Sequence, residues 1–457
     1  KLLGLLPLCG TLAEESSVLP LFSLTQLLPA MVRMTLSSIL AAGLAALAPC
    51  LVGADLGAAL RKSAAQAPAA LPADAPLSSA VVIPLRRVGP RNHQGAAGAS
   101  FYVGTVSVGH PPQELQVLFD TSSGHVLLPH RACKSAACLE HRRYSPWESS
   151  SAMDMNFNNG QVQEGHRLAR GVVRRDAATL MYTQSDLGDG DAKTVLVRDS
   201  LCVGSGASGQ ACTDMGLLAA ISLQEIPFRA MPNDGIIGLG LESLATGPIC
   251  SFFGRLLEGS RNVLPQFGFA FGAESGELHF GAHDTARLAA PLQWFPVDHP
   301  EDGYWQVAVR AVRVGNFTVD DCRQGCHGIV DTGVSRLGVQ TSHLPRLQVA
   351  LTSALSRHGG CHGPVLTFDL GDMVLALGPQ DYTDSKCAPQ LGPLSLEEPR
   401  FTGVYTFGET VLRRYYAAFD WEKRKLGFAP LARASTIVSD SPGKGLLRGG
   451  ASNLFVV

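Results

Sequence analysis

Two short segments of this chain repeat one pattern: an apolar, strand-like run that ends in an aspartate followed by a threonine. Residues 118–121 read LFDT and residues 329–332 read IVDT, so the two aspartates lie 211 positions apart. A carboxylate at the end of a buried strand is costly unless it is hydrogen-bonded or used in chemistry. The same costly arrangement at two distant places indicates two related domains rather than a short repeat.

The two aspartates, Asp120 and Asp331, form a candidate catalytic pair. Two carboxylates that face each other cannot both ionise cheaply, so one stays protonated while the other carries the charge. The charged member can remove a proton from a water molecule, and the protonated member can donate a hydrogen bond to the carbonyl under attack. Such a pair hydrolyses amides without a metal, a cofactor or a covalent intermediate, and we expect none here.

Composition narrows the class of protein. A chain of 457 residues is longer than a single domain with one hydrophobic core usually is, so two or more domains are expected. The formal net charge of −2 argues against a nucleic-acid partner. The 49 glycines and 28 prolines separate many short strand-like runs, which is typical of a turn-rich β protein. Apolar spacing predicts helices only near residues 249–259 and 341–355, the second with Thr341 as its candidate N-cap.

Cysteines and the N-terminal region indicate the secretory pathway. None of the 11 cysteines forms a CxxC motif, and no cysteine or histidine cluster has zinc-ligand spacing, so disulfides in an oxidising compartment are expected. An uncharged run over residues 35–54 follows Met31, Arg33 and Met34 and predicts a cleaved signal peptide. A retained anchor is the alternative. The expected location is extracellular or an acidic compartment of the lysosome or vacuole type.

Several ordered motifs resemble pepsin-like aspartic peptidases of the pepsin and cathepsin D type. They are the opening FYVGTVSVGHPPQELQVLFDTSSGHVLLP at 101–129, DGIIGLG at 234–240, DGYWQVAVRAVRVGN at 302–316 and the closing segment at 407–430. The resemblance covers about residues 99–430. It implies a mainly β, bilobal acid-protease fold with an active-site cleft between two related β-lobes and a few short helices.

This resemblance suggests a division of the chain into five parts. They are a leader with the signal peptide (1–54, starting at Met31 or Met34), a spacer or short pro-segment (55–98), an N-terminal lobe with Asp120 and the flap (99–275), a C-terminal lobe with Asp331 (276–430), and a flexible tail (431–457).

The resemblance also implies roles for individual residues. The hydroxyls of Thr121 and Thr332 should bond across the two active-site loops, with Ser123 and Gly333 as supporting residues. Tyr182 matches the tyrosine of the family's flap, a hairpin that closes over substrate; the alternative is a half-buried strand tyrosine. The implied disulfides are Cys133–Cys138, Cys322–Cys326 and Cys361–Cys387. Cys202–Cys212 is expected as a fourth pair outside the family pattern, leaving Cys250 as a buried thiol.

The chain departs from the family pattern beside the first aspartate. Ser122 stands where the family has glycine, with a glycine only at Gly124; Leu127 replaces a common tryptophan and Val334 a common hydroxyl residue. The predicted function is an aspartic endopeptidase. The alternative is a catalytically impaired homologue that binds peptides or proteins.

The remaining expectations concern partners and modification. The expected partners are polypeptide substrates and pepstatin-type inhibitors, and we expect a monomer. Asn316 heads the sequon Asn-Phe-Thr, which predicts N-glycosylation at a surface turn.

Overall fold

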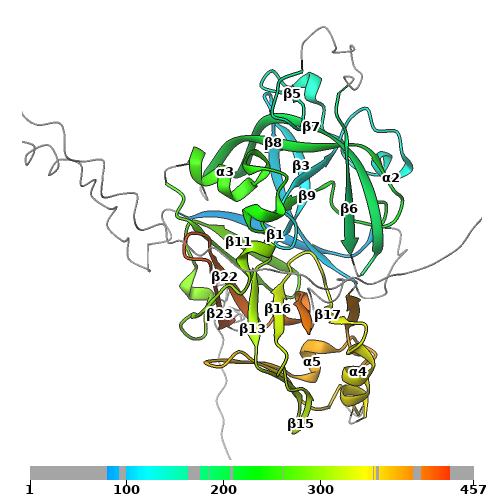
Figure 1. The fold of residues 1–457 in the computed structure, drawn as a ribbon, viewed down its shortest axis with the longest axis vertical. Helices are drawn as coiled ribbons and strands as arrows, with labels where there is room; N and C mark the ends of the chain where they lie inside the picture. Colours follow the sequence, from blue (N-terminus) through cyan, green and yellow to red (C-terminus); the bar gives the residue numbers. More distant parts are fainter. Residues whose placement is uncertain are drawn as a thin grey trace, which may run out of the picture. The chain divides into compact units, whose positions relative to one another are not determined.

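The computed structural model describes residues 80–91, 99–162, 175–184, 186–205, 209–260, 262–353, 355–356, 360–394 and 403–432 (Figure 1). All of them belong to one compact unit, Leu71–Val457. The predicted signal peptide, most of the spacer and nearly all of the C-terminal tail lie outside the described residues.

Strands arranged in three sheets are the main regular structure of the described chain, and helices are few, so the prediction of a mainly β fold is confirmed. The largest contains, in order, β12 (Gln293–Pro296), β23 (Lys425–Pro430), β22 (Tyr415–Asp420), β10 (Gln266–Phe271), β11 (Ser275–Phe280), β1 (Val81–Val88), β2 (Phe101–Val108), β3 (Gln113–Asp120), β9 (Gly235–Gly238), β4 (Val126–Pro129), β8 (Gln210–Leu223), β7 (Gly188–Gly204) and β5 (Met153–Met155), with β6 (Ala178–Gln184) paired to β7.

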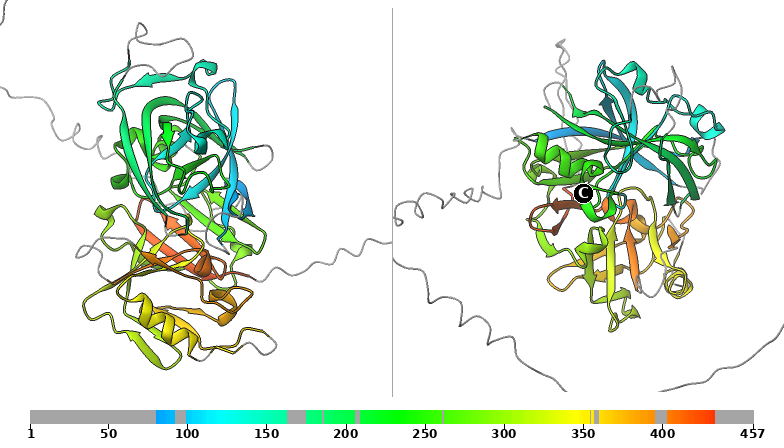
Figure 2. Two further views of the ribbon diagram at one scale, coloured as in Figure 1. Left: turned by 90° about the vertical axis from the view of Figure 1, so that its right-hand side faces the viewer. Right: turned by 45° about the horizontal axis from the view of Figure 1, so that its top comes forward.

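The other two sheets belong to the C-terminal lobe, drawn in yellow to orange in Figures 1 and 2. One runs β13 (Gln306–Val309), β16 (Cys326–Val330), β21 (Val404–Phe407), β17 (Leu337–Gln340), β20 (Leu391–Leu394). The other runs β15 (Phe317–Asp320), β14 (Ala311–Val314), β18 (Leu366–Asp369), β19 (Val374–Leu377).

The duplicated sequence pattern corresponds to a duplicated strand pattern. Strand β3 ends at Asp120 and pairs in parallel with β9, which pairs antiparallel with β4. Strand β16 ends one residue before Asp331 and pairs in parallel with β21, which pairs antiparallel with β17. Each lobe therefore delivers its aspartate at the end of a strand held by a parallel neighbour, as the bilobal prediction requires.

A shared aromatic core packs beneath the large sheet. Phe267 on β10 stacks on Phe419 of β22 with ring centroids 4.5 Å apart, and Trp305 meets Phe419 edge-on at 5.2 Å. Trp305 is fully buried and donates its indole N–H to the carbonyl of Leu239 at 2.8 Å. Because these rings come from distant parts of the chain, their burial stabilises the lobes jointly.

Helices are short. They are α2 (Ala136–Leu139), α3 (Phe252–Gly259), α4 (Leu344–Thr352), α5 (Pro379–Tyr382) and α6 (Glu409–Leu412), with 3-10 turns η3 (Pro146–Glu148), η6 (Glu242–Leu244), η7 (Pro248–Cys250), η8 (Thr285–Arg287) and η9 (Pro300–Asp302). Both expected helices form, but the expectation that Thr341 caps the second is wrong. Helix α4 starts three residues later, after His343, because Pro345 favours the first helical turn. Among the described residues, no helix is long and apolar enough to cross a membrane.

The described residues form four disulfides, and they are the four expected pairs: Cys133–Cys138, Cys202–Cys212, Cys322–Cys326 and Cys361–Cys387. Cys250 is free and buried, at the end of η7. Asn316 is exposed in the tight turn between β14 and β15, and its glycosylation stays a prediction.

Candidate active site

The two strand-end aspartates are both removed from solvent. Asp120 is 1% exposed and Asp331 is 8% exposed. In β3 and β16, the residues just before each aspartate are buried and apolar or glycine. Each carboxyl group therefore lies at the end of a buried run rather than within it. Both aspartates line one cavity of about 270 Å³.

Two threonines link the loops that carry the aspartates. The Thr121 hydroxyl donates to the carbonyl of Val330 at 2.7 Å, and the Thr332 hydroxyl donates to the carbonyl of Phe119 at 2.6 Å. Each hydroxyl also accepts the backbone N–H of the other threonine at 3.1 Å. This reciprocal set, with all four groups buried, fixes the two loops against each other.

The two carboxylates receive different hydrogen bonds. Oδ1 of Asp120 accepts both the backbone N–H and the hydroxyl of Ser122, each at 2.8 Å. Oδ1 of Asp331 accepts the backbone N–H of Gly333 at 2.8 Å. Hydrogen bonds to a carboxylate favour its charged form, so the serine hydroxyl is an extra donor for Asp120.

Burial and mutual repulsion set the order of ionisation. Burial raises the pKa of Asp120 above its ordinary value, and the Ser122 hydroxyl and amide, followed by Ser123, act in the opposite direction. Burial and then the charge of Asp120 raise the pKa of Asp331 well above its ordinary value. The pKa of Asp331 is therefore raised further than that of Asp120.

The two loops differ in how much space they leave for a side chain. A Cβ at Gly333 would lie 2.9 Å from Cγ of Asp120, closer than real Cβ contacts, whereas Ser122 fits at the equivalent place. Gly124 is also essential, because a Cβ there would lie 2.4 Å from the backbone of Leu244. The Ser123 hydroxyl, expected beside Asp120, is buried but makes no hydrogen bond of normal geometry.

Tyr182 lies on β6 and lines the cavity with the two aspartates. It is half-buried, and its ring lies 5.7 Å from that of Phe228. The half-buried strand position that was the alternative expectation is what the structure shows, and the role of Tyr182 in a substrate-covering flap stays a prediction.

Comparison with known proteins decides the family. The model of eukaryotic aspartyl proteases matches residues 101–185 and 183–431. The chain is 30% identical to cathepsin E-A of Xenopus laevis over 346 residues, covering 72% of this chain and 79% of that protein. The chain belongs to the eukaryotic aspartyl protease family. It is also similar to cathepsin E-B of Xenopus laevis (28% over 347 residues; 72% and 79% covered) and to pepsin B of Canis lupus familiaris (28% over 348 residues; 72% and 81% covered).

In this member of the aspartyl protease family, a contact of the candidate flap hairpin crosses between the lobes. Strands β6 and β7 form the hairpin, with Gln184 opposite Gly188, and Asp186 lies in its turn. The buried Asp186 carboxylate accepts the backbone N–H of Ser335 at 2.7 Å and its hydroxyl at 2.6 Å, and lies 3.4 Å from Nε of Arg336. The turn of the flap is thus tied to the loop that follows Asp331.

Sequence reasoning did not find this flap contact. Asp186 and Ser335 are 149 positions apart, and neither belongs to a recognisable motif. The only sequence signal was the unusual Asp186-LGDGD run after the flap tyrosine.

Proposed function

We propose that the protein is an aspartic endopeptidase that hydrolyses peptide bonds at acidic pH. The observation that carries the proposal is the pair of buried carboxyl groups, Asp120 and Asp331, presented into one cavity by two hydrogen-bonded loops.

Each carboxyl group has a distinct task. Ionised Asp120 takes a proton from a water molecule as its oxygen attacks the peptide carbonyl carbon, while protonated Asp331 donates a hydrogen bond to the developing oxyanion. The resulting tetrahedral species breaks its C–N bond when a proton passes to the leaving amine nitrogen. The products are a carboxylic acid and an amine, so one water molecule accounts for all added atoms.

The different surroundings of the two aspartates support this assignment. Ser122 donates two hydrogen bonds to Asp120 and so favours its charged form. Repulsion from Asp120 favours the protonated form of Asp331. Activity should rise as Asp120 ionises and fall as Asp331 ionises, which gives a bell-shaped dependence on pH.

The proposed substrates are polypeptides in extended form, lying between the flap and the two aspartates. Pepstatin-type inhibitors should compete for the same cavity. We further propose a monomer of the secretory pathway, acting outside the cell or in an acidic lysosome- or vacuole-like compartment, which agrees with four disulfides in the described chain.

The test is cleavage of denatured haemoglobin or casein at acidic pH, with and without pepstatin. Wild type should cleave, pepstatin should stop it, and Asp120→Asn and Asp331→Asn should each abolish it while folding normally. Asp372→Asn, an exposed aspartate in the turn between β18 and β19, is the matched control and should retain activity. Tight pepstatin binding without any cleavage would instead support a peptide-binding homologue.

A further inference from the structure

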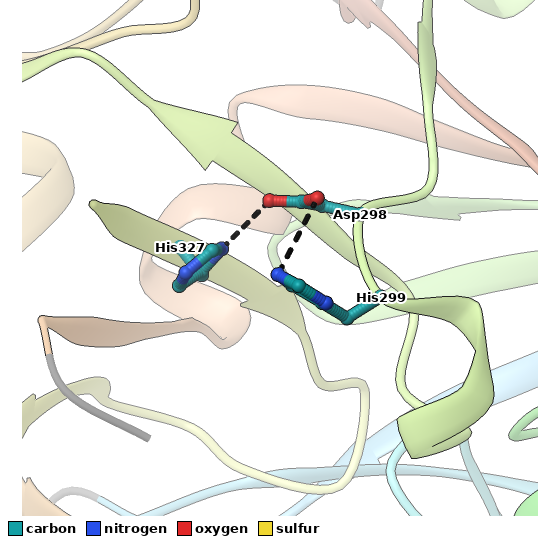
Figure 3. A group of neighbouring side chains, drawn as sticks. All are labelled: Asp298, His299 and His327. Carbon is teal, nitrogen blue, oxygen red and sulfur yellow. Dashed lines mark ion pairs between the residues drawn. The ribbon is translucent and has the colours of Figure 1, made fainter. Parts of the chain in front are cut away.

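A group of three metal-ligand side chains lies outside the cavity of the two aspartates. Asp298 and His299 lie between β12 and η9, and His327 lies on β16 (Figure 3). One ligand atom from each residue lies within 4.8 Å of the others. None of the three lines the cavity.

The spacing of these atoms suits one small divalent ion. Asp298 Oδ2 lies 2.9 Å from His327 Nδ1, and Asp298 Oδ1 lies 3.8 Å from His299 Nε2. Ligands of tetrahedral zinc, bound at about 2.0–2.1 Å, lie roughly 3.3 Å from one another. One distance is shorter than that value and the other is longer, and they involve different oxygens of Asp298, so small side-chain movements would bring one atom of each residue onto one ion.

The His327–Asp298 contact is not a hydrogen bond, despite its length. Nδ1 of His327 is buried and has no hydrogen-bond partner of acceptable geometry, although an Asp298 oxygen lies 2.9 Å away. In a hydrogen bond the donor points at the acceptor. Two ligands of one ion instead both point at the ion, so they can lie close, as in this ion pair, without a hydrogen bond between them.

The other histidine has an orienting partner. Nδ1 of His299 lies 3.2 Å from a carboxylate oxygen of Glu301, in hydrogen-bond contact. A carboxylate in this position holds the proton on Nδ1 and leaves Nε2 as the free donor of an electron pair, the usual arrangement around zinc-bound histidine. His299 also adopts a left-handed backbone (φ 46°), which a non-glycine residue keeps only when its surroundings require it.

We propose that Asp298, His299 and His327 bind a zinc ion, with a fourth position left to water. Two imidazoles and one carboxylate are a donor set that zinc favours. The sequence spacing predicted no metal site because folding, not spacing, brings residue 327 beside residues 298 and 299.

In the part of the chain that the structure describes, two other groups of ligand-type side chains are already engaged. Cys322 and Cys326 near Asp320 form a disulfide, and Glu277 near His279 pairs with the guanidinium of Arg287. Neither group offers an unengaged set of donors.

The ion would tie the η9 loop to the strand that leads to Asp331. The same loop contacts the N-terminal lobe, where Ser243 donates to the carbonyl of Pro300 at 3.3 Å and Leu241 N–H donates to the carbonyl of Gly303 at 2.9 Å. Zinc should therefore raise the melting temperature, because a ligand that binds only the folded state stabilises it.

The test is independent of protease activity. Untagged secreted protein is stripped with a chelator and dialysed against zinc chloride at neutral pH, where imidazoles are available as ligands. Wild type should retain one zinc per chain and melt at a higher temperature with zinc than without. His299→Ala and His327→Ala should lose both effects, whereas His362→Ala, an exposed histidine elsewhere, should keep them.

A finer readout separates binding at this site from binding elsewhere. Glu301→Ala should still bind one zinc but about 10–100-fold more weakly, because it removes only the orienting partner of His299. Circular dichroism checks that each variant is folded, and Asp298→Asn replaces either histidine variant if one is not. Zinc retained equally by wild type and the His299→Ala/His327→Ala double variant would overturn the proposal, as would no zinc retained by folded wild type.

Discussion

Ser122 offers a sharp test of how the pair of aspartates is tuned. In Ser122→Gly the hydroxyl that donates to Asp120 Oδ1 at 2.8 Å is lost, while the backbone N–H at the same distance remains. The lost bond favours the charged form of Asp120, so its pKa should rise. Ser122 also lowers the pKa of Asp331, so both limbs of the activity profile should move to higher pH.

The size of the shift follows from the energy of one such bond. A hydrogen bond to a charged group contributes about 1.5–3 kcal/mol. One pKa unit corresponds to about 1.36 kcal/mol. The acid limb of kcat/KM should therefore move upward by about 1 to 2 units. Turnover at the new optimum should change less than about tenfold, because the positions of both aspartates are retained.

The assay is kcat/KM for a peptide substrate across the acid range, for wild type, Ser122→Gly and Ser122→Ala. Alanine keeps the Cβ and removes only the hydroxyl, so the two variants should shift alike if the hydroxyl is responsible. An acid limb that stays in place in both variants would refute the reasoning. A shift of the acid limb in Ser122→Gly but not in Ser122→Ala would show that the cause is the greater backbone freedom of glycine at this position, not the lost hydroxyl.

Four further outcomes are expected. Gly333→Ala should reduce kcat by roughly 100-fold or more, because its Cβ would lie 2.9 Å from Asp120 Cγ and displace a catalytic group. Steady-state kinetics measures this loss, and a kcat near that of wild type would contradict the expectation. The folded pKa of Asp331 lies above the unfolded value, so its contribution to stability is present below about pH 4 and is lost as pH rises. The melting temperature of Asp331→Asn should consequently fall less than that of wild type when the pH is raised from acidic to neutral. An equal fall in both proteins would exclude this. Asp186→Ala should speed amide hydrogen exchange in β6, whereas the exposed Asp189→Ala should not; equal rates would show that the flap is held by other contacts. Asn316→Gln should abolish a glycosidase-sensitive mass shift of protein made in a eukaryotic secretory host, and an unshifted wild type would show that the sequon is unoccupied.

The paired aspartates were predictable because their signal is local and occurs twice. Each lies at the end of an apolar run, and the repetition of Asp120-Thr121 as Asp331-Thr332 suggests that two lobes meet there. Three of the four disulfides were predicted from the family resemblance, and only Cys202–Cys212 was expected outside it.

The flap contact and the metal-ligand cluster could not be read from the sequence. Asp186 looks like one more acidic loop residue until folding places it 2.7 Å from the N–H of Ser335. His327 looks like a strand residue until β16 brings it beside Asp298. In both cases the informative quantity is a distance across many residues, which spacing along the chain does not encode.

The order of strands in the large sheet means that the lobes are not separable modules. Strand β10 precedes the expected lobe boundary at 275–276, yet it pairs with β22 near the C-terminal end of the described chain. Strand β11 spans the boundary, yet it pairs with β1 near the N-terminal end of the described chain. A fragment ending at residue 275 would leave Phe267 without its stacking partner Phe419 and β10 with an unpaired edge. Half-length fragments should therefore aggregate when made alone and recover only when co-expressed with the complementary half.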